Sequence, residues 1–247
     1  MRLFGLIGYP LGHSFSASFF NEKLEKEGIE ARYRNFPLEK IVDFQILLEN
    51  EPQLAGLNVT VPYKQEIIPF LDTLSPTAAA IQAVNTISLR KEKGKVFLKG
   101  DNTDVIGFRR SLEQHLKSQH TSALVLGTGG SSLAVQYVLA ELGIPFIRVS
   151  RSAGEGRITY EDLDSRIVSE TPLIINTTPL GMYPNVGTFP RIPYDVLTPD
   201  HLLFDLVYNP EISAFLEKGR TSGAQCVNGH DMLIFQALAS WEIWNAR

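Results

Sequence analysis

A chain of 247 residues, 44% of them hydrophobic, can form one large α/β domain or two smaller ones. Its formal net charge of −4 at pH 7 gives no broad basic surface, which argues against nucleic acid as the main partner. Cys226 is the single cysteine, so a disulfide within the chain is excluded and a reducing compartment is favoured.

The N-terminal residues predict a strand and a turn. The apolar run is interrupted by Gly5, Gly8 and Pro10 and lacks a convincing cleavage pattern, so it is not typical of a signal peptide. No apolar stretch approaches the roughly 20 residues that span a bilayer, and we expect a cytoplasmic protein with no membrane partner. The histidines show no ligand spacing, which predicts that no metal is bound; they are His13, His115, His120, His201 and His230.

Strands and helices alternate along the chain, which predicts an α/β fold with largely parallel strands. In the first part we expect a helix over 14–28, with a serine near its cap and Gly28 as its stop, and a second helix over 38–50. The expected strands are 2–8, 31–36, 56–61, 86–90 and 95–100, with the last two as a hairpin.

The stretch GLNVTVPYKQ, residues 56–65, alternates as a half-buried strand, with Leu57, Val59 and Val61 on one face. Pro62 ends the strand and predicts a following helix. Lys64 then falls in the first turn of that helix, where a cation opposes the helix dipole, so stability alone does not explain it. A solvated surface lysine is the alternative interpretation.

A second α/β unit is expected after a helix opened by Thr103 and the polar stretch 117–122. Its expected helix is 131–143, and the segment 229–246 is a long apolar helix that can pack on either unit. The expected strands are 122–127, 144–150, 172–178, 201–207 and 224–227.

The first strand of this second unit leads into a glycine-rich turn, Gly127-Thr128-Gly129-Gly130, and then a helix, which predicts a pyrophosphate site. A tight turn without a ligand is the alternative. The next strand ends in Ser150-Arg151-Ser152, where an NAD site usually has an acidic residue. Because an arginine fork matches a phosphate, this end favours NADP over NAD.

The combination of motifs resembles the shikimate dehydrogenase family over nearly the whole chain. Its parts, in order, are Gly8, Pro10, His13, Ser14 and Ser16; Asn58 to Lys64; Ala83 to Thr86; Gly100 to Asp104; Gly127 to Gly130; Asn176 to Met182; Asp205, Tyr208 and Pro210; and Gly229, Met232, Leu233 and Gln236. The chain has Ala17 where that family usually has proline.

The resemblance implies an NADP(H)-dependent enzyme that reversibly reduces 3-dehydroshikimate to shikimate. It implies a substrate domain, residues 1–104 with 229–247 packed back on it, a Rossmann-like NADP domain, residues 105–228, and a cleft between them. It assigns Lys64 and Asp104 as the catalytic pair. The implied substrate residues are Ser14, Ser16, Thr60, Asn85, Tyr208 and Gln236, and the implied cofactor residues are Gly127, Gly129, Gly130, Ser131, Ser150, Arg151, Ser152 and Gly229.

The chemistry needs such a set, because hydride delivery to a ketone places negative charge on its oxygen, which a positioned ammonium can stabilise and protonate. We expect Asp104 chiefly to orient Lys64. Two alternatives stay open: a quinate/shikimate dehydrogenase of broader specificity, and a catalytically silent regulator that binds NADP or shikimate. The resemblance allows a monomer or a homodimer.

Overall fold

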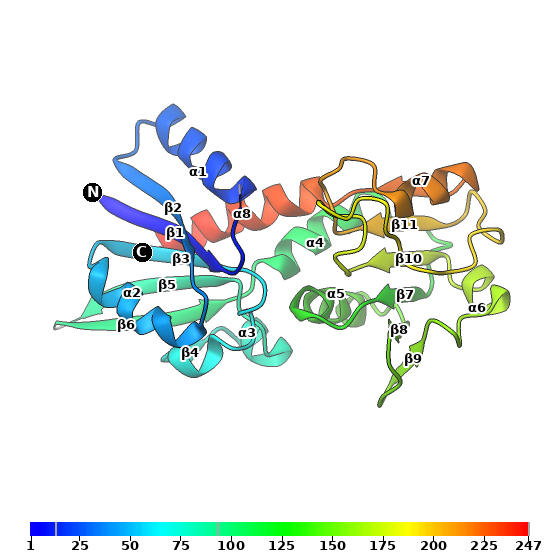
Figure 1. Ribbon diagram of the computed structural model, residues 1–247, viewed down its shortest axis with the longest axis horizontal. Coiled ribbons are helices and arrows are strands. Elements are labelled where there is room, and N and C mark those ends of the chain that lie inside the picture. The colour runs from blue at the N-terminus through cyan, green and yellow to red at the C-terminus, as the bar shows by residue number, and fades with distance from the viewer. Residues whose placement is uncertain (13, 93, 247) are drawn as a thin grey trace. The chain divides into compact units, whose positions relative to one another are not determined.

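The computed structural model describes residues 1–12, 14–92 and 94–246, which form two compact units (Figure 1). The first unit comprises Met1–Thr103 and Ala237–Arg247, and the second comprises Asp104–Gln236. The chain therefore passes between units directly after Thr103 and again inside its last helix, whereas the expected boundaries lay after residues 104 and 228. His13, part of the N-terminal motif, lies outside the described residues.

The first unit is built on a mixed sheet. Its strands are β1 (Arg2–Gly8), β2 (Ala31–Pro37), β3 (Leu54–Val59), β4 (Thr73–Leu74), β5 (Thr86–Glu92) and β6 (Lys95–Asp101), in the order β2-β1-β3-β5-β6-β4. β1 pairs in parallel with β2 and β3, while β5 is antiparallel to β3 and β6. The predicted hairpin is confirmed as the β5–β6 pair.

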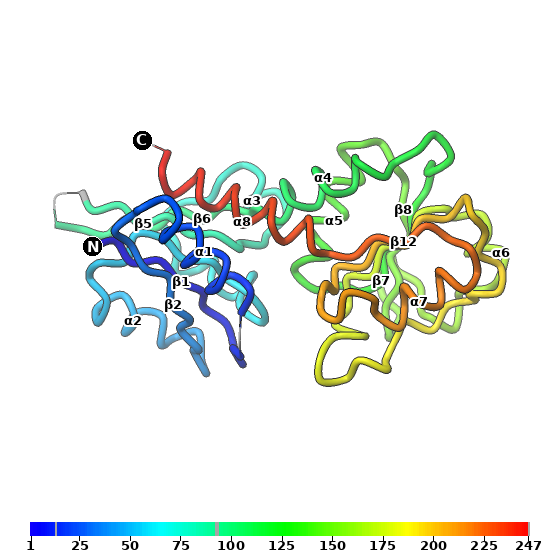
Figure 2. Tube along the Cα trace, turned by 90° about the horizontal axis from the view of Figure 1, so that it is seen from above, coloured from blue at the N-terminus to red at the C-terminus, as the bar shows by residue number. Residues whose placement is uncertain are grey.

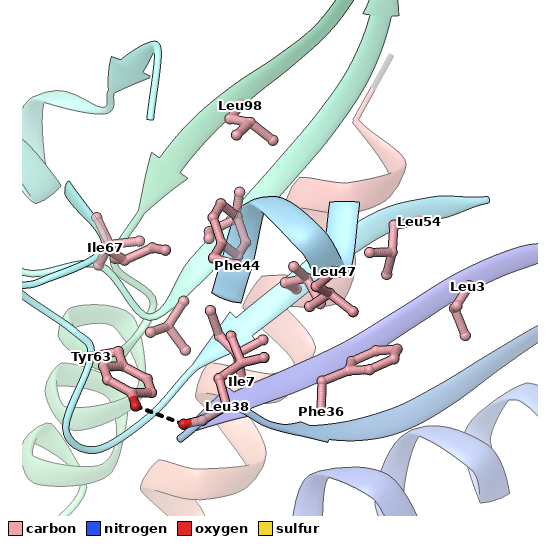
Figure 3. Packing of buried hydrophobic residues seen from close by; sticks show 14 of the residues in the cluster. Leu3, Ile7, Phe36, Leu38, Phe44, Leu47, Leu54, Tyr63, Ile67 and Leu98 are labelled. Carbon is pink, nitrogen blue, oxygen red and sulfur yellow. Dashed lines mark hydrogen bonds between the residues drawn. The ribbon is translucent and has the colours of Figure 1, made fainter. Parts of the chain in front are cut away.

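Helices cover both faces of this sheet. Apolar side chains of the sheet and of α2 (Phe44–Asn50), which follows the 3₁₀ turn η1 (Ile41–Asp43), form one core cluster (Figure 3). On the other face, α1 (Phe15–Lys26) lies beside the last turns of α8 (His230–Asn245) (Figures 1 and 2). Phe20 of α1 there meets the rings of Trp241 and Trp244. The short helix α3 (Pro76–Ile81) precedes β5.

The predicted N-terminal helix is confirmed, with Ser14 as its N-cap and Gly28 just beyond its end in the left-handed region at φ +62°. The Ser14 hydroxyl accepts the backbone N–H of Ala17 at 3.2 Å. A serine cap and a glycine stop are thus read correctly from the sequence, because both satisfy local backbone requirements.

The helix expected after Pro62 is wrong. Residues 61–67 form a turn, followed only by the 3₁₀ helix η2 (Ile68–Phe70). Pro69 has no N–H to donate and its ring clashes with the preceding turn, so an α-helix that began at Pro62 could not continue through it. Val61 is 68% exposed and is not on a buried strand face, because β3 ends at Val59.

The second unit has a parallel sheet of six strands covered by helices. Its elements are α4 (Asp104–Glu113), β7 (Ala123–Leu126), α5 (Gly130–Glu141), β8 (Phe146–Ser150), β9 (Arg157–Thr159), α6 (Ser165–Ser169), β10 (Leu173–Asn176), β11 (Leu202–Asp205), α7 (Ala214–Thr221) and β12 (Gln225–Val227). The order β12-β11-β10-β7-β8-β9, numbered from β7, is the 3-2-1-4-5-6 order of a Rossmann fold.

The strand order of this sheet reverses between β7 and β10, and ligands of such sheets bind beside the carboxyl ends at this switch point. Helices α6 and α7 pack their apolar residues on one face, and Phe108 of α4 meets Phe204 of β11 at 5.2 Å between ring centroids. None of the helices in the described ranges combines the length and apolar content that a membrane crossing requires.

Candidate active site

Lys64 stands on a turn that is fixed from both sides. Tyr63 is buried, and its hydroxyl donates to the carbonyl oxygen of Leu38 at 2.6 Å (Figure 3). Ile67 is fully buried, and its backbone N–H closes one α-type turn onto the carbonyl of Tyr63. The carbonyl of Lys64 itself accepts the backbone N–H of Val84 at 2.7 Å. Core anchors rather than a helix therefore position this half-buried lysine.

Asn85, one residue beyond Val84, is held in a single orientation. The backbone N–H of Thr103 donates to Asn85 Oδ1 at 2.7 Å, while Asn85 Nδ2 donates to Thr103 Oγ1 at 3.0 Å. Because a backbone N–H can only donate, the amide oxygen must face Thr103, and the amide nitrogen is a donor. Asp104 follows Thr103 directly in the chain. Residues 84 and 85 thus hold both the Lys64 turn and the segment that leads to Asp104.

In the second unit, Asp104 is the first residue of α4 and is 5% exposed. An acidic residue in the first turn is favourable to the helix dipole. One turn later, a Cβ on Gly107 would lie 2.5 Å from the carbonyl oxygen of Met232 and 3.0 Å from Gln236 Cβ. Glycine therefore lets α8 approach α4 closely, and the predicted Gln236 lies against Gly107, three residues after Asp104.

Ser14 and Ser16 both interact with polar side chains of β2. Ser14 Oγ donates to Asn35 Oδ1 at 2.8 Å, and the orientation of Asn35 is set by its Nδ2, which donates to the carbonyl of Gly12. Ser16 hydrogen-bonds the phenol of Tyr33, whose pKa is strongly raised by burial. A carboxylate bound at Ser14 would replace an existing acceptor, Asn35 Oδ1.

Two further predicted substrate residues occupy strand ends or loops. Thr60 directly follows β3, is half-buried, and donates its backbone N–H to Ile7 at 2.9 Å. Tyr208 lies three residues after β11 in the second unit, and burial raises the pKa of its phenol.

The glycine turn after β7 has the features of a pyrophosphate site. Gly127 adopts φ +111°, and a Cβ there would lie 2.6 Å from Thr177 Oγ1, which follows β10 across the switch point. Gly129 is the N-cap of α5, has no side chain to cap the helix, and faces open space. Gly130 and Ser131 form the first turn of α5, which contains no acidic residue to compete for an anion.

The segment after β8 holds the predicted 2′-phosphate residues. Ser150 ends β8, and Arg151 and Ser152 are exposed directly after it. Arg148 holds the loop that follows β8, because its guanidinium donates to the carbonyls of Gly156 at 2.8 Å and Glu155 at 2.9 Å. Burial raises the pKa of Tyr160 to about 12, and the charge of Arg151 opposes this rise.

Gly229 is a predicted cofactor residue, and the packing around it requires a glycine, since a Cβ at this position would collide with the backbone of Leu206.

Asp205, the residue before Leu206, is buried and accepts hydrogen bonds from Asn176 Nδ2 at 2.9 Å, from Val207 N at 3.0 Å and from the Ser213 hydroxyl. Burial outweighs these bonds and raises the pKa of Asp205 to about 6. Within the described residues no cluster of His, Cys, Asp or Glu has the form of a metal site.

Relatives of the chain are numerous and extend over its length. A family model described as the shikimate dehydrogenase substrate binding domain matches residues 6–87. The NADP⁺-dependent shikimate dehydrogenase of Halothermothrix orenii is 38% identical over 269 residues, which cover 98% of this chain and 90% of the relative. The chain belongs to the shikimate dehydrogenase family.

Solved structures of this family share the fold. The shikimate dehydrogenase of Thermus thermophilus, solved with NADP(H) and shikimate, has a TM-score of 0.86 and 28% identity, covering 99% of this chain and 94% of that one. A quinate dehydrogenase of Corynebacterium glutamicum, solved with NAD, has a TM-score of 0.82 and 28% identity, covering 99% and 93%. The predicted fold class, two α/β domains of this family, is confirmed.

The predicted site residues of this shikimate dehydrogenase family member divide between the units. Lys64, Ser14, Ser16, Thr60 and Asn85 belong to the first, whereas Asp104, Tyr208, Gln236 and the cofactor residues belong to the second. Sequence reasoning missed several polar side chains that bond to these residues or to segments next to them, namely Asn35, Tyr33, Arg148 and Ser240. A serine at 240 inside the apolar run ALASWEIW was the available signal for the last of them.

Proposed function

We propose that this chain is an NADP-dependent shikimate dehydrogenase that reversibly reduces 3-dehydroshikimate to shikimate, a step of aromatic amino acid biosynthesis. The observation that carries this proposal is that two segments far apart in the sequence, one containing Lys64 and one leading to Asp104, are both hydrogen-bonded to residues 84 and 85. The Lys64 turn is bonded there through Val84, and the Thr103–Asp104 segment is bonded there through Asn85.

Lys64 is the proposed proton donor and acceptor. Its ammonium group stabilises the charge that develops on the carbonyl oxygen during reduction and delivers the proton; in the reverse direction the amine accepts the proton of the hydroxyl. Asp104 is its proposed partner, because a carboxylate favours the charged, oriented lysine. The rigid turn around Lys64 supports this role, since positioning is what such catalysis requires.

Shikimate recognition is assigned to the remaining polar residues. Asn85 meets a ring hydroxyl as a donor through Nδ2, because its oxygen is occupied by Thr103. Thr60, Tyr208 and Gln236 complete the substrate set. Ser14 and Ser16 bind the carboxylate, and the Ser14 proton turns from Asn35 to the ligand.

The residues of the second unit fit NADP. The uncapped N-terminus of α5 with Gly127, Gly129, Gly130 and Ser131 receives the pyrophosphate. Ser150, Arg151 and Ser152 receive the 2′-phosphate, and Gly229 lets the backbone at 206 and 229 approach closely. When bound, the nicotinamide supplies or accepts the hydride.

The test is absorbance at the nicotinamide band when the purified chain is mixed with shikimate and NADP⁺. Formation of the reduced nicotinamide supports the proposal. Thermal stabilisation by both ligands without any change in absorbance would instead identify a silent binding protein.

A broader quinate/shikimate specificity is the second candidate, favoured by the similarity to the quinate dehydrogenase structure. Assays of both acids with both NAD⁺ and NADP⁺ separate the two. Turnover of quinate with NAD⁺ at a kcat/KM comparable to that of shikimate with NADP⁺ would favour the second candidate.

We further place the enzyme in the cytoplasm, as a monomer or a homodimer. The single cysteine supports a reducing compartment. Sedimentation at several protein concentrations distinguishes the two oligomeric states, and fractionation of the native cells tests the location.

A further inference from the structure

A continuous network of buried polar side chains lies in the first unit and includes the proposed substrate residue Asn85. Each member is at most 5% exposed, and the members come from strands, from the residues just before β5 and just before α4, and from the last helix; they are Tyr33, Asn58, Asn85, Thr86, Thr103 and Ser240. Buried polar groups are costly unless bonded, so a cluster of this size requires specific partners.

Ser240 of α8 is the junction of this network. Asn58 Nδ2 donates to its hydroxyl at 3.0 Å. The Ser240 oxygen lies 2.8 Å from Thr86 Oγ1 and 3.0 Å from Thr103 Oγ1. One hydroxyl on the C-terminal helix therefore touches side chains of β3, of β5 and of the segment before Asp104.

The path from Ser240 to Asn85 runs through the two threonines. Thr86 Oγ1 and Thr103 Oγ1 each donate to Asn85 Oδ1 at 3.1 Å. In each contact between Ser240 and a threonine either oxygen can be the donor, so the Ser240 hydroxyl is placed to donate to a threonine oxygen while it accepts from Asn58. Ser240 thus lets both threonines face Asn85 instead of each other, although their oxygens are only 3.2 Å apart.

We propose that Ser240 is a positioning residue that holds Asn85 in the orientation for substrate binding and so makes α8 part of the shikimate site. This inference rests on the proposed function, because Asn85 is the group through which Ser240 acts. Removal of the Ser240 hydroxyl allows one threonine to donate to the other, and Asn85 then loses one of the bonds that orient its amide.

The decisive variant is Ser240→Ala, and Ser111→Ala is its matched control. Ser111 is also a fully buried serine on a helix, but its hydroxyl has no hydrogen-bond partner among the described residues. We expect Ser240→Ala to raise the KM for shikimate about three- to tenfold, the range for loss of one hydrogen bond, with the KM for NADP⁺ unchanged. Ser111→Ala should change neither constant.

A double-mutant cycle with Asn85→Ala separates positioning from a general loss of stability. If Ser240 acts through Asn85, its effect on the KM for shikimate disappears when Asn85 is already alanine. Thr86→Val, an isosteric change that removes one of the connecting hydroxyls, should reproduce the Ser240→Ala phenotype. It serves as the test if Ser240→Ala does not fold, as judged by its melting temperature.

The outcomes distinguish the two proposals. Wild-type protein that does not oxidise shikimate with NADP⁺ overturns the proposed function and this inference with it. Active wild-type protein, combined with a Ser240→Ala variant that matches Ser111→Ala in KM, overturns the inference alone. An effect of Ser240→Ala that persists in full beside Asn85→Ala does the same.

Discussion

The backbone N–H of Thr103 donates to Asn85 Oδ1 at 2.7 Å and thereby fixes which end of this amide is a donor. The bond also joins the residue before Asp104 to the residue after Val84, which holds the Lys64 turn. Lys64 and Asn85, a proposed catalytic residue and a proposed substrate residue of the first unit, are consequently held at the same short segment, residues 84 and 85, and changes at Asn85 test that arrangement directly.

We expect Asn85→Asp to bind shikimate better as the pH falls. Aspartate keeps the acceptor for Thr103 but loses the donor while it is ionised; once protonated it can donate again. Burial raises the pKa of such a carboxyl, so recovery begins above its ordinary range. The KM for shikimate, measured at steady state in buffers between about pH 5 and about pH 8, checks this expected pH dependence. Asn85→Ala, which lacks a titratable group, should show no greater pH dependence than wild type.

Lys64→Ala should lower kcat by at least about a hundredfold, because the carbonyl oxygen loses its proton donor and its stabilising charge. The melting temperature should change little, since the turn is held by the buried neighbours Tyr63 and Ile67. Lys40→Ala, an exposed lysine of the same unit, is the control and should retain kcat. Near-normal turnover by Lys64→Ala would remove the proposed mechanism.

Much of the fold could be read from local signals. The Ser14 cap, the Gly28 stop and the glycine turn at 127–130 were recognised because each satisfies a backbone requirement within a few residues. The segment after Pro62 was misjudged because the effect of Pro69 was not weighed against the start signal of Pro62. Lys64 was still identified, since its chemistry did not depend on a helix.

The buried polar contacts around the proposed site residues could not be predicted from local signals in the sequence. Asn58 was expected on the less buried face of its strand, but it is only 5% exposed because α8 returns over that face. Its bond to Ser240 joins residues 182 positions apart. No periodicity within a strand or helix specifies such a partner, and only the assembled core reveals it.

Arg151→Ala should weaken NADP⁺ binding about ten- to a hundredfold and leave NAD⁺ binding nearly unchanged. The loss of a charge-assisted hydrogen bond from arginine to a phosphate accounts for this range, and NAD⁺ makes no such bond because it has no 2′-phosphate. Arg148→Ala should produce a smaller change in the same direction, because it releases the carbonyls of Glu155 and Gly156.

Titration calorimetry with both dinucleotides measures these affinities. Arg191→Ala, an exposed arginine elsewhere in the second unit, serves as the control for a general loss of positive charge. Equal losses for NAD⁺ and NADP⁺ in Arg151→Ala would contradict the assignment of the 2′-phosphate.

Asp205 should make folding less favourable as the pH rises from about 4 to about 6. Burial raises its folded pKa from 3.8 to about 6, so over this window the folded state binds more protons than the unfolded state. The stabilisation from this group is therefore complete below the unfolded pKa and is lost by pH values above the folded pKa, an effect on the order of 3 kcal/mol.

Denaturant unfolding at several pH values, with Asp205→Asn beside wild type, isolates this contribution. The variant loses one acceptor oxygen for the three donors around residue 205, so it should be less stable overall. The decline in its free energy of unfolding between about pH 4 and about pH 6 should nevertheless be smaller than that of wild type. Asp195→Asn, an exposed carboxyl in the same unit, should leave the wild-type pH dependence in place. Parallel curves for Asp205→Asn and wild type would show that Asp205 titrates alike in both states and that its three hydrogen bonds offset its burial.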